Sequence, residues 1–401
     1  MKICLINTYK GGGAGIACRR LQAALNKHGA TAQLLTREEA GKKWPFYAER
    51  LSFLPYEKDK SVRFAFSLAN FGSDISKHPA VQEADIIHLH WVNQGFLSLQ
   101  NIRTLGQLGK PIVWTLHDMW AFTGGCHYSR GCDHFQQTCG DCDYLRRPGP
   151  LDLSHHILGR KARLLPQNIQ YVTCSRWLGE VAQSSTLLQD AAVLSIPNPI
   201  DTEAFKPLEG PTRRQVREAL GIRPGKAALL FVAMKISETR KGFAFLQKAL
   251  HALKTRHPEL DLDIMVLGKA EAGMAEALPY PTRLLGLLTD AQAIANAYAA
   301  ADLFVIPSLE DNLPNTVMES LACGTPVAGF NTGGIPEMVE DGVQGLIAPQ
   351  GDAWALEKAI FGILTQENPE KMRQAARLKV ETHYSEAVIA GRYMDLYRSL
   401  L

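Results

Sequence analysis

The sequence has little net charge and no long apolar run. Its 43 Lys and Arg residues nearly balance 40 Asp and Glu residues, and a formal net charge of +3 over 401 residues is too small to indicate nucleic acid as the main partner. The opening segment MKICLINTYKGGG has an apolar run shorter than that of a signal peptide and no small-residue cleavage site. No run reaches the length of a transmembrane helix. These absences predict a cytoplasmic protein.

Because cytoplasmic proteins keep their thiols reduced, the eight cysteines are predicted to be thiols or metal ligands and not disulfides. Four of them lie in one polar stretch, CHYSRGCDHFQQTCGDC: Cys126, Cys132, Cys139 and Cys142. Such a set of thiolates can bind zinc tetrahedrally and brace a loop that has no apolar core of its own. An iron–sulfur site, free thiols and a redox pair are the alternatives, and Asp118, His127 or His134 could replace one cysteine as a ligand.

The common phosphate-binding signatures are also missing. The glycine-rich YKGGGAGIACRRL follows the first predicted strand, but Gly11, Gly13 and Gly15 give G-x-G-x-G and not the dinucleotide fingerprint G-x-G-x-x-G. None of the four Gly-Lys pairs is followed by Ser or Thr, so there is no P-loop. The glycine run is either a flexible turn that approaches a ligand or a tightly packed strand–helix turn.

Short apolar runs alternate with amphipathic helical patterns such as residues 16–29 along the whole chain. The predicted strands are 2–7, 31–36, 85–90, 111–116, 169–174, 192–197, 227–233, 262–268, 283–288, 302–307 and 325–330. This alternation predicts α/β domains with parallel sheets covered on both faces, and it occurs in two series. We place the first domain at 1–205 and the second at 206–384, because Pro and charged residues cluster at 196–215. The amphipathic segment 385–401 either closes the second domain or crosses back onto the first.

The most informative stretch is PSLEDNLPNTVMESLACGTPVAGFNTGGIPEMV, residues 307–339. A strand is predicted to end at Pro307, and a helix to begin after Pro314, which places Asp311 in the loop and Glu319 inside the helix. The first-turn N–H groups of that helix form an anion site, and a carboxylate such as Glu319 can hold a vicinal diol such as a ribose. Gly333 allows close approach of backbone. The alternative is a surface loop with solvated acids and an ordinary helix cap.

In order and spacing, this string resembles the retaining glycosyltransferases of family 4, which have the GT-B fold: two Rossmann-like doubly wound domains that face each other across a cleft. That family has two glutamates separated by seven residues; Glu319 matches the second, and Asp311 lies at the position of the first. Residues 196–207 resemble the interdomain segment of the family, and residues 240–250 resemble its Lys-Gly-helix element. The terminal YMDLY resembles the helix that returns to the first domain.

The resemblance implies roles for individual residues. His117 in TLHD, Lys241 and Asp311 would act at the reacting sugar and the diphosphate. Other residues implied to bind the donor are Gly12, Gly13, Lys235, Arg240, Asn315, Thr316, Glu319 and Gly333. Lys235 and Arg240 are alternatives for a cation that the family carries at the preceding strand end.

The implied reaction transfers a sugar, with retention, from a nucleotide-sugar donor to a hydroxyl acceptor. A UDP- or GDP-sugar is the expected donor, and a glycan or lipid-linked glycan the expected acceptor, in polysaccharide or cell-envelope synthesis. The resemblance also implies catalysis without a metal ion. A nucleotide-sugar 2-epimerase and a non-catalytic nucleotide-sugar-binding protein are the alternatives on this fold.

Two further patterns leave alternatives open. His88 and His90 share one strand face, which suits either a metal or hydrogen-bonded core groups. The segment KKWPFYAERLSFLPYEKDKSVRFAF, residues 42–66, mixes basic and aromatic residues. It is either a peripheral contact with the inner, anionic face of a membrane or an ordinary helix that packs its aromatic residues inward.

Overall fold

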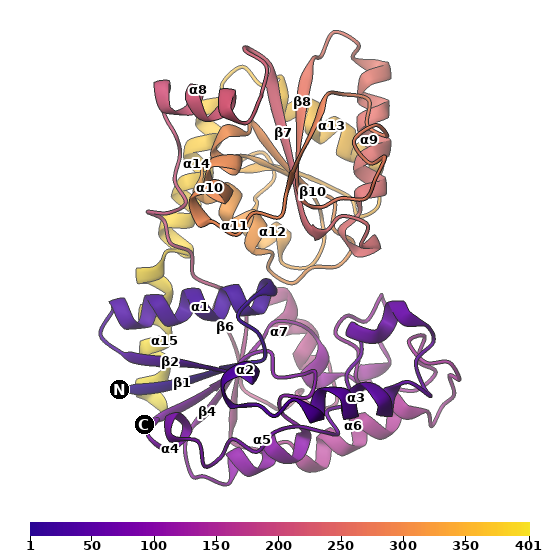
Figure 1. Cartoon of the computed structure of the whole chain (residues 1–401), viewed down its shortest axis with the longest axis vertical. Coiled ribbons are helices and arrows are strands. Elements are labelled where there is room, and N and C mark those ends of the chain that lie inside the picture. Colours follow the sequence, from indigo (N-terminus) through magenta and orange to yellow (C-terminus); the bar gives the residue numbers. More distant parts are fainter. The chain divides into compact units, whose positions relative to one another are not determined.

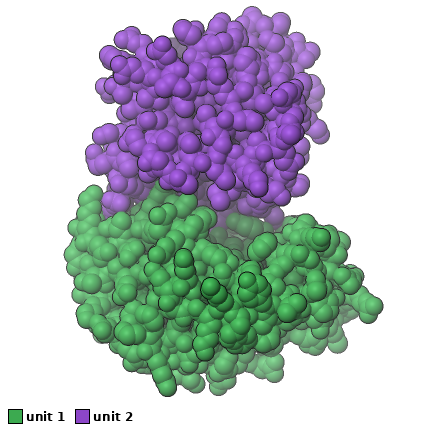
Figure 2. Space-filling view, viewed as in Figure 1, with its two compact units in different colours: residues 1–199, 389–401 green, residues 200–388 purple.

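The computed structural model describes all 401 residues, which form two compact units (Figures 1 and 2). Unit 1 comprises residues 1–199 and 389–401, and unit 2 comprises residues 200–388. The sequence predicts the corresponding boundaries at 205 and 385, a few residues away from those of the structure. The difference has a local cause: Ile200 forms a parallel bridge with Ser385, and the Ile200 amide donates to the Tyr384 carbonyl at 2.9 Å. These two segments therefore belong to one unit.

Unit 1 contains a six-stranded parallel sheet in the order β2-β1-β3-β4-β5-β6. Its strands are β1 (Lys2–Asn7), β2 (Thr31–Thr36), β3 (Ile86–Leu89), β4 (Ile112–Leu116), β5 (Ile169–Thr173) and β6 (Val193–Ser195). Its helices are α1 (Gly12–Lys27), α2 (Arg37–Ala40), α3 (Trp44–Phe53), α4 (Pro79–Gln82), α5 (Leu99–Gly106), α6 (Leu153–Leu164), α7 (Arg176–Gln183) and most of α15 (Glu386–Leu400). Along β1, Ile3 and Leu5 enter one apolar core and Cys4 and Ile6 enter another, so the sheet is buried on both faces.

Helix α15 completes the core on one face of the unit 1 sheet. Ile389, Tyr393 and Tyr397 are fully or almost fully buried in the cluster that contains Ile3 and Leu5. Most of its contacts are apolar, but the two tyrosine hydroxyl groups bond to polar groups on β3 and β4. Helix α1 covers the rest of this face through Cys18, Leu21 and Leu25, so α1 and α15 together close it.

Unit 2 contains a second six-stranded parallel sheet, in the order β12-β11-β10-β7-β8-β9. Its strands are β7 (Ala227–Lys235), β8 (Leu262–Lys269), β9 (Thr282–Gly286), β10 (Leu303–Ile306), β11 (Val327–Phe330) and β12 (Gly345–Ala348). Its helices are α8 (Gly210–Ala219), α9 (Phe243–Arg256), α10 (Ala291–Ala300), α11 (Asn315–Ala322), α12 (Ile335–Met338), α13 (Ala353–Leu364) and α14 (Pro369–His383). In Figure 1, α9 and α13 lie on one side of β7 and β8, and α10 and α11 on the other.

The predicted α/β class with two parallel sheets is confirmed, and two local predictions are wrong. The strand β12 was missed, because GLIA is short, begins with Gly and is only half-buried at Leu346 and Ile347 on the sheet edge. Helix α1 begins at Gly12, four residues before the predicted start at Ile16. No helix in the structure is both long enough and apolar enough to span a membrane.

Each sheet has one point where the chain reverses direction across it, between β1 and β3 in unit 1 and between β10 and β7 in unit 2. Ligands of open α/β sheets bind beyond the carboxyl ends of the strands at such points. The residues that follow these strands are Thr8 and His90 in unit 1, and Ile236 and Pro307 in unit 2. The fold therefore predicts that a ligand binds at the loops that begin with these residues.

We expect Ile389→Ala to lower the free energy of unfolding by about 2–4 kcal/mol, because a fully buried side chain would leave a cavity under the sheet. Leu378→Ala on α14 is the matched control, since Leu378 is 59% exposed. Differential scanning calorimetry gives the comparison. Equal effects of the two substitutions would contradict the role assigned to α15.

Candidate functional site

Three loops of unit 2 meet at the carboxyl ends of β7, β10 and β11. Two glycines make this possible. A Cβ on Gly242 would lie 1.8 Å from the Pro307 carbonyl oxygen, and a Cβ on Gly333 would lie 1.7 Å from that of Asp311. Both glycines have positive φ, +70° and +55°. The Gly334 amide also donates to the Asn312 carbonyl at 2.7 Å. The predicted close approach at Gly333 is therefore toward the loop that carries Asp311.

Asp311 lies at the centre of these loops and is 7% exposed. Its Oδ2 is 2.6 Å from Lys241 Nζ and 3.7 Å from an Arg240 guanidinium nitrogen. Burial alone would raise the pKa of Asp311, but the Lys241 and Arg240 charges outweigh it and hold the pKa below its ordinary value. Asp311 is therefore an ionised acceptor, and the structure brings together the predicted residues Asp311, Lys241 and Arg240.

The two alternative cations, Arg240 and Lys235, have different environments. The Arg240 guanidinium donates to Glu238 at 2.9 Å and to the Glu310 carbonyl at 2.7 Å, so it braces the loop. Lys235 ends β7, is exposed and forms no ion pair. A phosphate group could therefore bind Lys235 without breaking an ion pair, whereas binding Arg240 would compete with its bonds to Glu238 and Glu310.

Helix α11 begins beside this loop at Asn315, and its N-cap residue, Pro314, makes no side-chain capping bond. Asn315 and Thr316 are half-buried in that turn, and Glu319 follows on the next turn at 8% exposure. The first turn of a helix carries backbone N–H groups without intrahelical partners and the positive end of the helix dipole. The predicted donor-binding residues of this segment thus lie on one short helix.

In unit 1, His88 and His90 belong to the core. His88 is fully buried, and its two ring nitrogens lie 2.7 Å from the Tyr397 hydroxyl and 2.8 Å from the Thr115 hydroxyl. Burial lowers the pKa of His88 to about 3. The metal alternative for this histidine pair is thus wrong, because the hydrogen bonds of His88 use both nitrogens and no three His, Cys, Asp or Glu side chains are arranged as metal ligands.

His117 follows β4 and is half-buried. Its Nε2 lies 2.9 Å from Nδ1 of His90, and its Nδ1 lies 3.5 Å from the Cys174 sulfur. Burial lowers the pKa of His117 to about 4, with a smaller opposite contribution from Asp118. The ring is therefore neutral at pH 7, and its orientation is fixed by neighbours that the sequence did not identify.

The glycine run forms the start of α1. Gly12 has φ of +74°, and a Cβ on Gly12 or Gly13 would meet no atom within 4 Å. Gly15 differs, since its Cβ would lie 2.4 Å from the Tyr9 carbonyl oxygen. The run thus combines the two alternatives given above: tight packing at Gly15, and open space over Gly12 and Gly13.

A pocket of about 450 Å³ lies in unit 1 beside the ends of β1 and β2. Its lining combines aromatic rings with cations: Tyr9, Phe46, Tyr47, Lys10, Arg37, Lys42 and Lys43, with Glu38 as the one acid. The Arg37 guanidinium lies 5.0 Å from the centre of the Tyr9 ring and 4.7 Å from that of Phe46. Sequence reasoning missed this pocket; the signal was the position of Thr8–Lys10 directly after the first strand.

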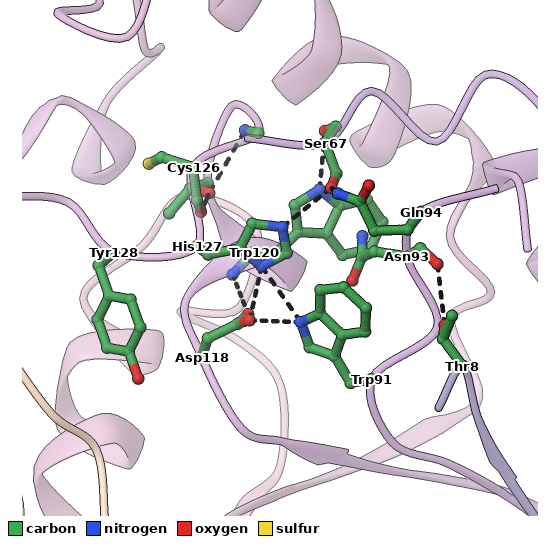
Figure 3. A network of polar contacts seen from close by, with 12 residues as sticks. Thr8, Ser67, Trp91, Asn93, Gln94, Asp118, Trp120, Cys126, His127 and Tyr128 are labelled. Atoms are coloured by element: carbon green, nitrogen blue, oxygen red, sulfur yellow. Dashed lines mark hydrogen bonds and ion pairs between the residues drawn. The ribbon is translucent and has the colours of Figure 1, made fainter. Parts of the chain in front are cut away.

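A buried polar network supports the loop after β4 (Figure 3). Asp118 Oδ2 lies 2.6 Å from His127 Nδ1 and accepts from the Trp91 indole at 2.8 Å. His127 Nε2 lies 2.9 Å from the Ser67 hydroxyl. Burial alone would raise the pKa of Asp118. The His127 charge and these hydrogen bonds together outweigh burial, so the pKa lies below its ordinary value. Both His127 nitrogens are engaged, and Asp118 Oδ1 accepts from the Trp120 amide at 2.9 Å, so neither side chain is available to replace a cysteine ligand. His134 Nδ1 lies 2.9 Å from the Gly140 carbonyl oxygen, and its role as a ligand stays a prediction.

The four cysteines of the 126–142 loop are all free, and their sulfurs are near enough to influence one another electrostatically. Burial raises the pKa of Cys139 to about 11 and that of Cys142 to about 12, while the Lys161 charge lowers that of Cys139. No three of the side chains are arranged as ligands around one point. The structural zinc at Cys126, Cys132, Cys139 and Cys142 stays a prediction, and no step below depends on it.

The candidate residues of units 1 and 2 lie in segments that match known protein families. Residues 11–204 match the family model described as Glycosyltransferase Family 4, and residues 226–366 match that described as Glycosyl transferases group 1. The chain is built from glycosyltransferase domains. The two matched segments contain, respectively, the glycine run with His117 and the loops around Asp311.

Curated relatives of this glycosyltransferase carry related names. It is 24% identical to D-inositol 3-phosphate glycosyltransferase 2 of Catenulispora acidiphila, over 97% of this chain and 90% of the relative. It is 25% identical to the putative colanic acid biosynthesis glycosyl transferase WcaC of Escherichia coli, over 80% and 77%. It is 32% identical to the amylovoran biosynthesis glycosyltransferase AmsK of Erwinia amylovora, over 40% and 42%.

Solved structures share the fold of this glycosyltransferase. Sucrose-phosphate synthase from Thermosynechococcus elongatus superposes with a TM-score of 0.68 at 20% identity, over 100% of this chain and 99% of that chain. Anabaena HepE in complex with UDP-glucose gives a TM-score of 0.64 at 17% identity, over 100% of both chains. These likenesses support the GT-B type of two-domain α/β fold.

If the cysteine loop binds zinc, the purified protein will contain about one zinc ion per chain by plasma mass spectrometry. Cys139→Ser/Cys142→Ser will then lose the metal and melt at a lower temperature, because the polar loop loses its cross-link. Cys323→Ser, in unit 2, is the control for thiol loss. Full zinc content in the double variant, or none in the wild type, would contradict a site made by these cysteines.

Proposed function

We propose that this glycosyltransferase transfers a sugar from a nucleotide-sugar donor to a hydroxyl group of a glycan or lipid-linked glycan, with retention at the anomeric carbon. The observation that carries the proposal is the buried Asp311–Lys241 ion pair beyond the carboxyl ends of β7 and β10, where the chain reverses direction across the sheet. Lys235 ends β7, and α11 begins at Asn315, shortly after Asp311. This place combines cations and helix amides for a diphosphate with an ionised acceptor for sugar hydroxyls.

The donor diphosphate would bind Lys241 and Lys235. Lys241 is paired with Asp311 at 2.6 Å, so the bound diphosphate would share or take over the ammonium group while Asp311 accepts hydrogen bonds from the donor sugar. The growing negative charge on the leaving phosphate would be stabilised by these cations and by the first-turn amides of α11. The proposed catalysis requires no metal ion.

The remaining donor contacts would come from residues around α11. Glu319 would hold the ribose hydroxyls, since a carboxylate accepts two hydrogen bonds at once. Asn315 and Thr316 would contribute first-turn contacts. Gly333, where a Cβ would collide with the Asp311 carbonyl, keeps the loop in place.

Unit 1 would supply the acceptor side. Gly12 and Gly13 leave open space in which backbone can approach a ligand, and His117 would contact the donor sugar as a neutral ring. The basic, aromatic pocket is suited to a saccharide that carries an acidic group, because aromatic rings pack against sugar faces and Arg37, Lys42 and Lys43 attract an anion. We assign no general base.

The names of relatives support a role in polysaccharide synthesis, since WcaC and AmsK are named for colanic acid and amylovoran biosynthesis. The structures of HepE with UDP and with UDP-glucose support a UDP-sugar as donor. The cytoplasmic location expected from the sequence stays a prediction. Product analysis with and without a glycan acceptor distinguishes transfer from 2-epimerisation of the donor and from binding without reaction.

The first test is thermal stabilisation by UDP-, GDP-, ADP- and TDP-sugars and the free nucleotides. A ligand at about 100 times its Kd adds roughly 2.7 kcal/mol to the stability of the folded state, so one nucleotide series is expected to raise the melting temperature. Glu319→Ala is expected to weaken that series at least tenfold, because the ribose loses its acceptor, whereas Glu367→Ala, an exposed control in unit 2, keeps it. Unchanged donor affinity in Glu319→Ala would refute the ribose assignment.

His117→Ala is expected to reduce turnover at least tenfold while donor affinity stays within about threefold. Its loss also removes bonding partners of His90 and Cys174, which costs about 1–3 kcal/mol of stability. Melting temperature and kcat are therefore measured together, with His156→Ala as an exposed control in unit 1. Near-normal kcat in a folded His117→Ala protein would remove His117 from the site.

A further inference from the structure

Helix α3 presents apolar side chains to solvent along one face. Trp44, Tyr47 and Leu51 are 55%, 63% and 67% exposed. These positions are spaced three and four residues apart, so they form a single stripe on the helix. A surface helix of a water-soluble domain normally turns such a stripe toward the core.

The opposite face of α3 buries a carboxylate. Glu49 is 4% exposed, and its two oxygens accept hydrogen bonds from four consecutive backbone amides, those of residues 68–71, at 2.6–3.1 Å. Rotating the helix to bury its apolar stripe would break all four bonds and expose these amides. The outward direction of Trp44, Tyr47 and Leu51 is therefore fixed by the fold.

Neighbouring residues enlarge this face. Leu54, Tyr56 and Phe64 are 46%, 48% and 64% exposed. Arg50 ties the two segments together, because its guanidinium lies 5.0 Å from the centre of the Phe64 ring and donates to the Arg63 carbonyl at 2.8 Å. We call the six apolar side chains the α3 surface: Trp44, Tyr47, Leu51, Leu54, Tyr56 and Phe64. They are six of the sixteen large apolar side chains that the chain exposes, all within residues 44–64.

Positive charge surrounds the α3 surface, and the nearby acids are largely withdrawn. Four lysines of the segment are exposed and form no ion pair: Lys42, Lys43, Lys58 and Lys60. Glu49 is inside the fold, and Glu57 is 4% exposed and bound at both oxygens by Arg63. Within residues 42–66, Asp59 is the exposed acid, and it caps the Ser61 amide at 2.7 Å. Glu38, an exposed acid of the unit 1 pocket, lies just before this segment.

The charges decide which occupant fits. In a symmetric dimer the same surface would face itself, so the lysines of one copy would approach those of the other. An anionic lipid surface attracts them instead, and Trp and Tyr side chains favour the boundary between headgroups and acyl chains. We propose that the α3 surface docks on the anionic headgroup layer of a lipid bilayer.

The position of the surface adds a consequence that rests on the proposed function. Lys42, Lys43 and Tyr47 also line the unit 1 pocket. Docking would therefore place the mouth of this pocket close to headgroups, where the anionic part of a lipid-linked acceptor lies. The docking itself is tested without any sugar transfer, so its failure is distinguishable from failure of the proposed function.

The test is co-sedimentation of the full chain with vesicles of neutral phosphatidylcholine or of phosphatidylcholine with 30% phosphatidylglycerol. We expect binding to the anionic vesicles, at least tenfold weaker binding to neutral ones, and loss of most binding in 0.5 M salt. Leu51→Glu is expected to weaken binding at least tenfold. Leu378→Glu, at a similarly exposed leucine in unit 2, is expected to leave it unchanged.

Lys58→Glu/Lys60→Glu separates charge from apolar insertion and is expected to remove the preference for anionic lipid. Unchanged melting temperatures verify that each variant is folded. Equal binding of wild type and Leu51→Glu, or no binding by the wild type, would overturn the proposal. A concentration-dependent dimer that Leu51→Glu abolishes, without vesicle binding, would assign the α3 surface to a second copy of the chain and would also overturn it.

Discussion

The ion pair between Asp311 and Lys241 is the interaction on which the candidate donor site depends. A carboxylate that is 93% buried is costly unless its charge is compensated, and Lys241 at 2.6 Å and Arg240 at 3.7 Å supply the compensation. The pair in turn depends on two glycines, because any side chain at Gly242 or Gly333 would push the loops away from residues 307–311. Charge and backbone shape are thus coupled at the end of β10.

In unit 1, buried polar side chains are also compensated by partners, but the partners are neutral hydroxyl groups. At the ends of β3 and β4 the sequence places histidines where one would expect apolar side chains, and each ring nitrogen of His88 finds a hydroxyl group from Thr115 or from Tyr397 of α15. The terminal helix therefore supplies polar partners as well as apolar cover. A change in α15 would reach His90 and His117 through this chain of contacts, since the His88 and His90 rings lie 4.2 Å apart.

Much of the fold could be predicted from the sequence because strand runs such as KICLIN and DLFVIP are short, continuous and apolar, as buried parallel strands require. The candidate site residues came from two kinds of signal: His117 directly follows a predicted strand, whereas Lys241 and Asp311 were assigned by the resemblance of residues 240–250 and 307–339 to the glycosyltransferase family. Their partners were not predictable. Nothing local in the sequence indicates that Asp311 meets Lys241, seventy residues away, or that His117 lies between His90 and Cys174. The sequence left the orientation of α3 open for a similar reason, because the four amides that hold Glu49 and fix the helix belong to residues 68–71.

The network in Figure 3 contains three residues that resemble a catalytic triad. Asp118, His127 and Ser67 are joined in the order of a hydrolase triad, with an acid on one ring nitrogen and a hydroxyl on the other. A template search by side-chain geometry alone would select them as a nucleophile, a base and an orienting acid. Yet Ser67 is 3% exposed and its oxygen accepts from the Gln94 amide at 3.2 Å, so no acyl group can approach it. These three residues therefore share the hydrogen-bond order of a protease or esterase triad, but a substrate cannot reach the serine.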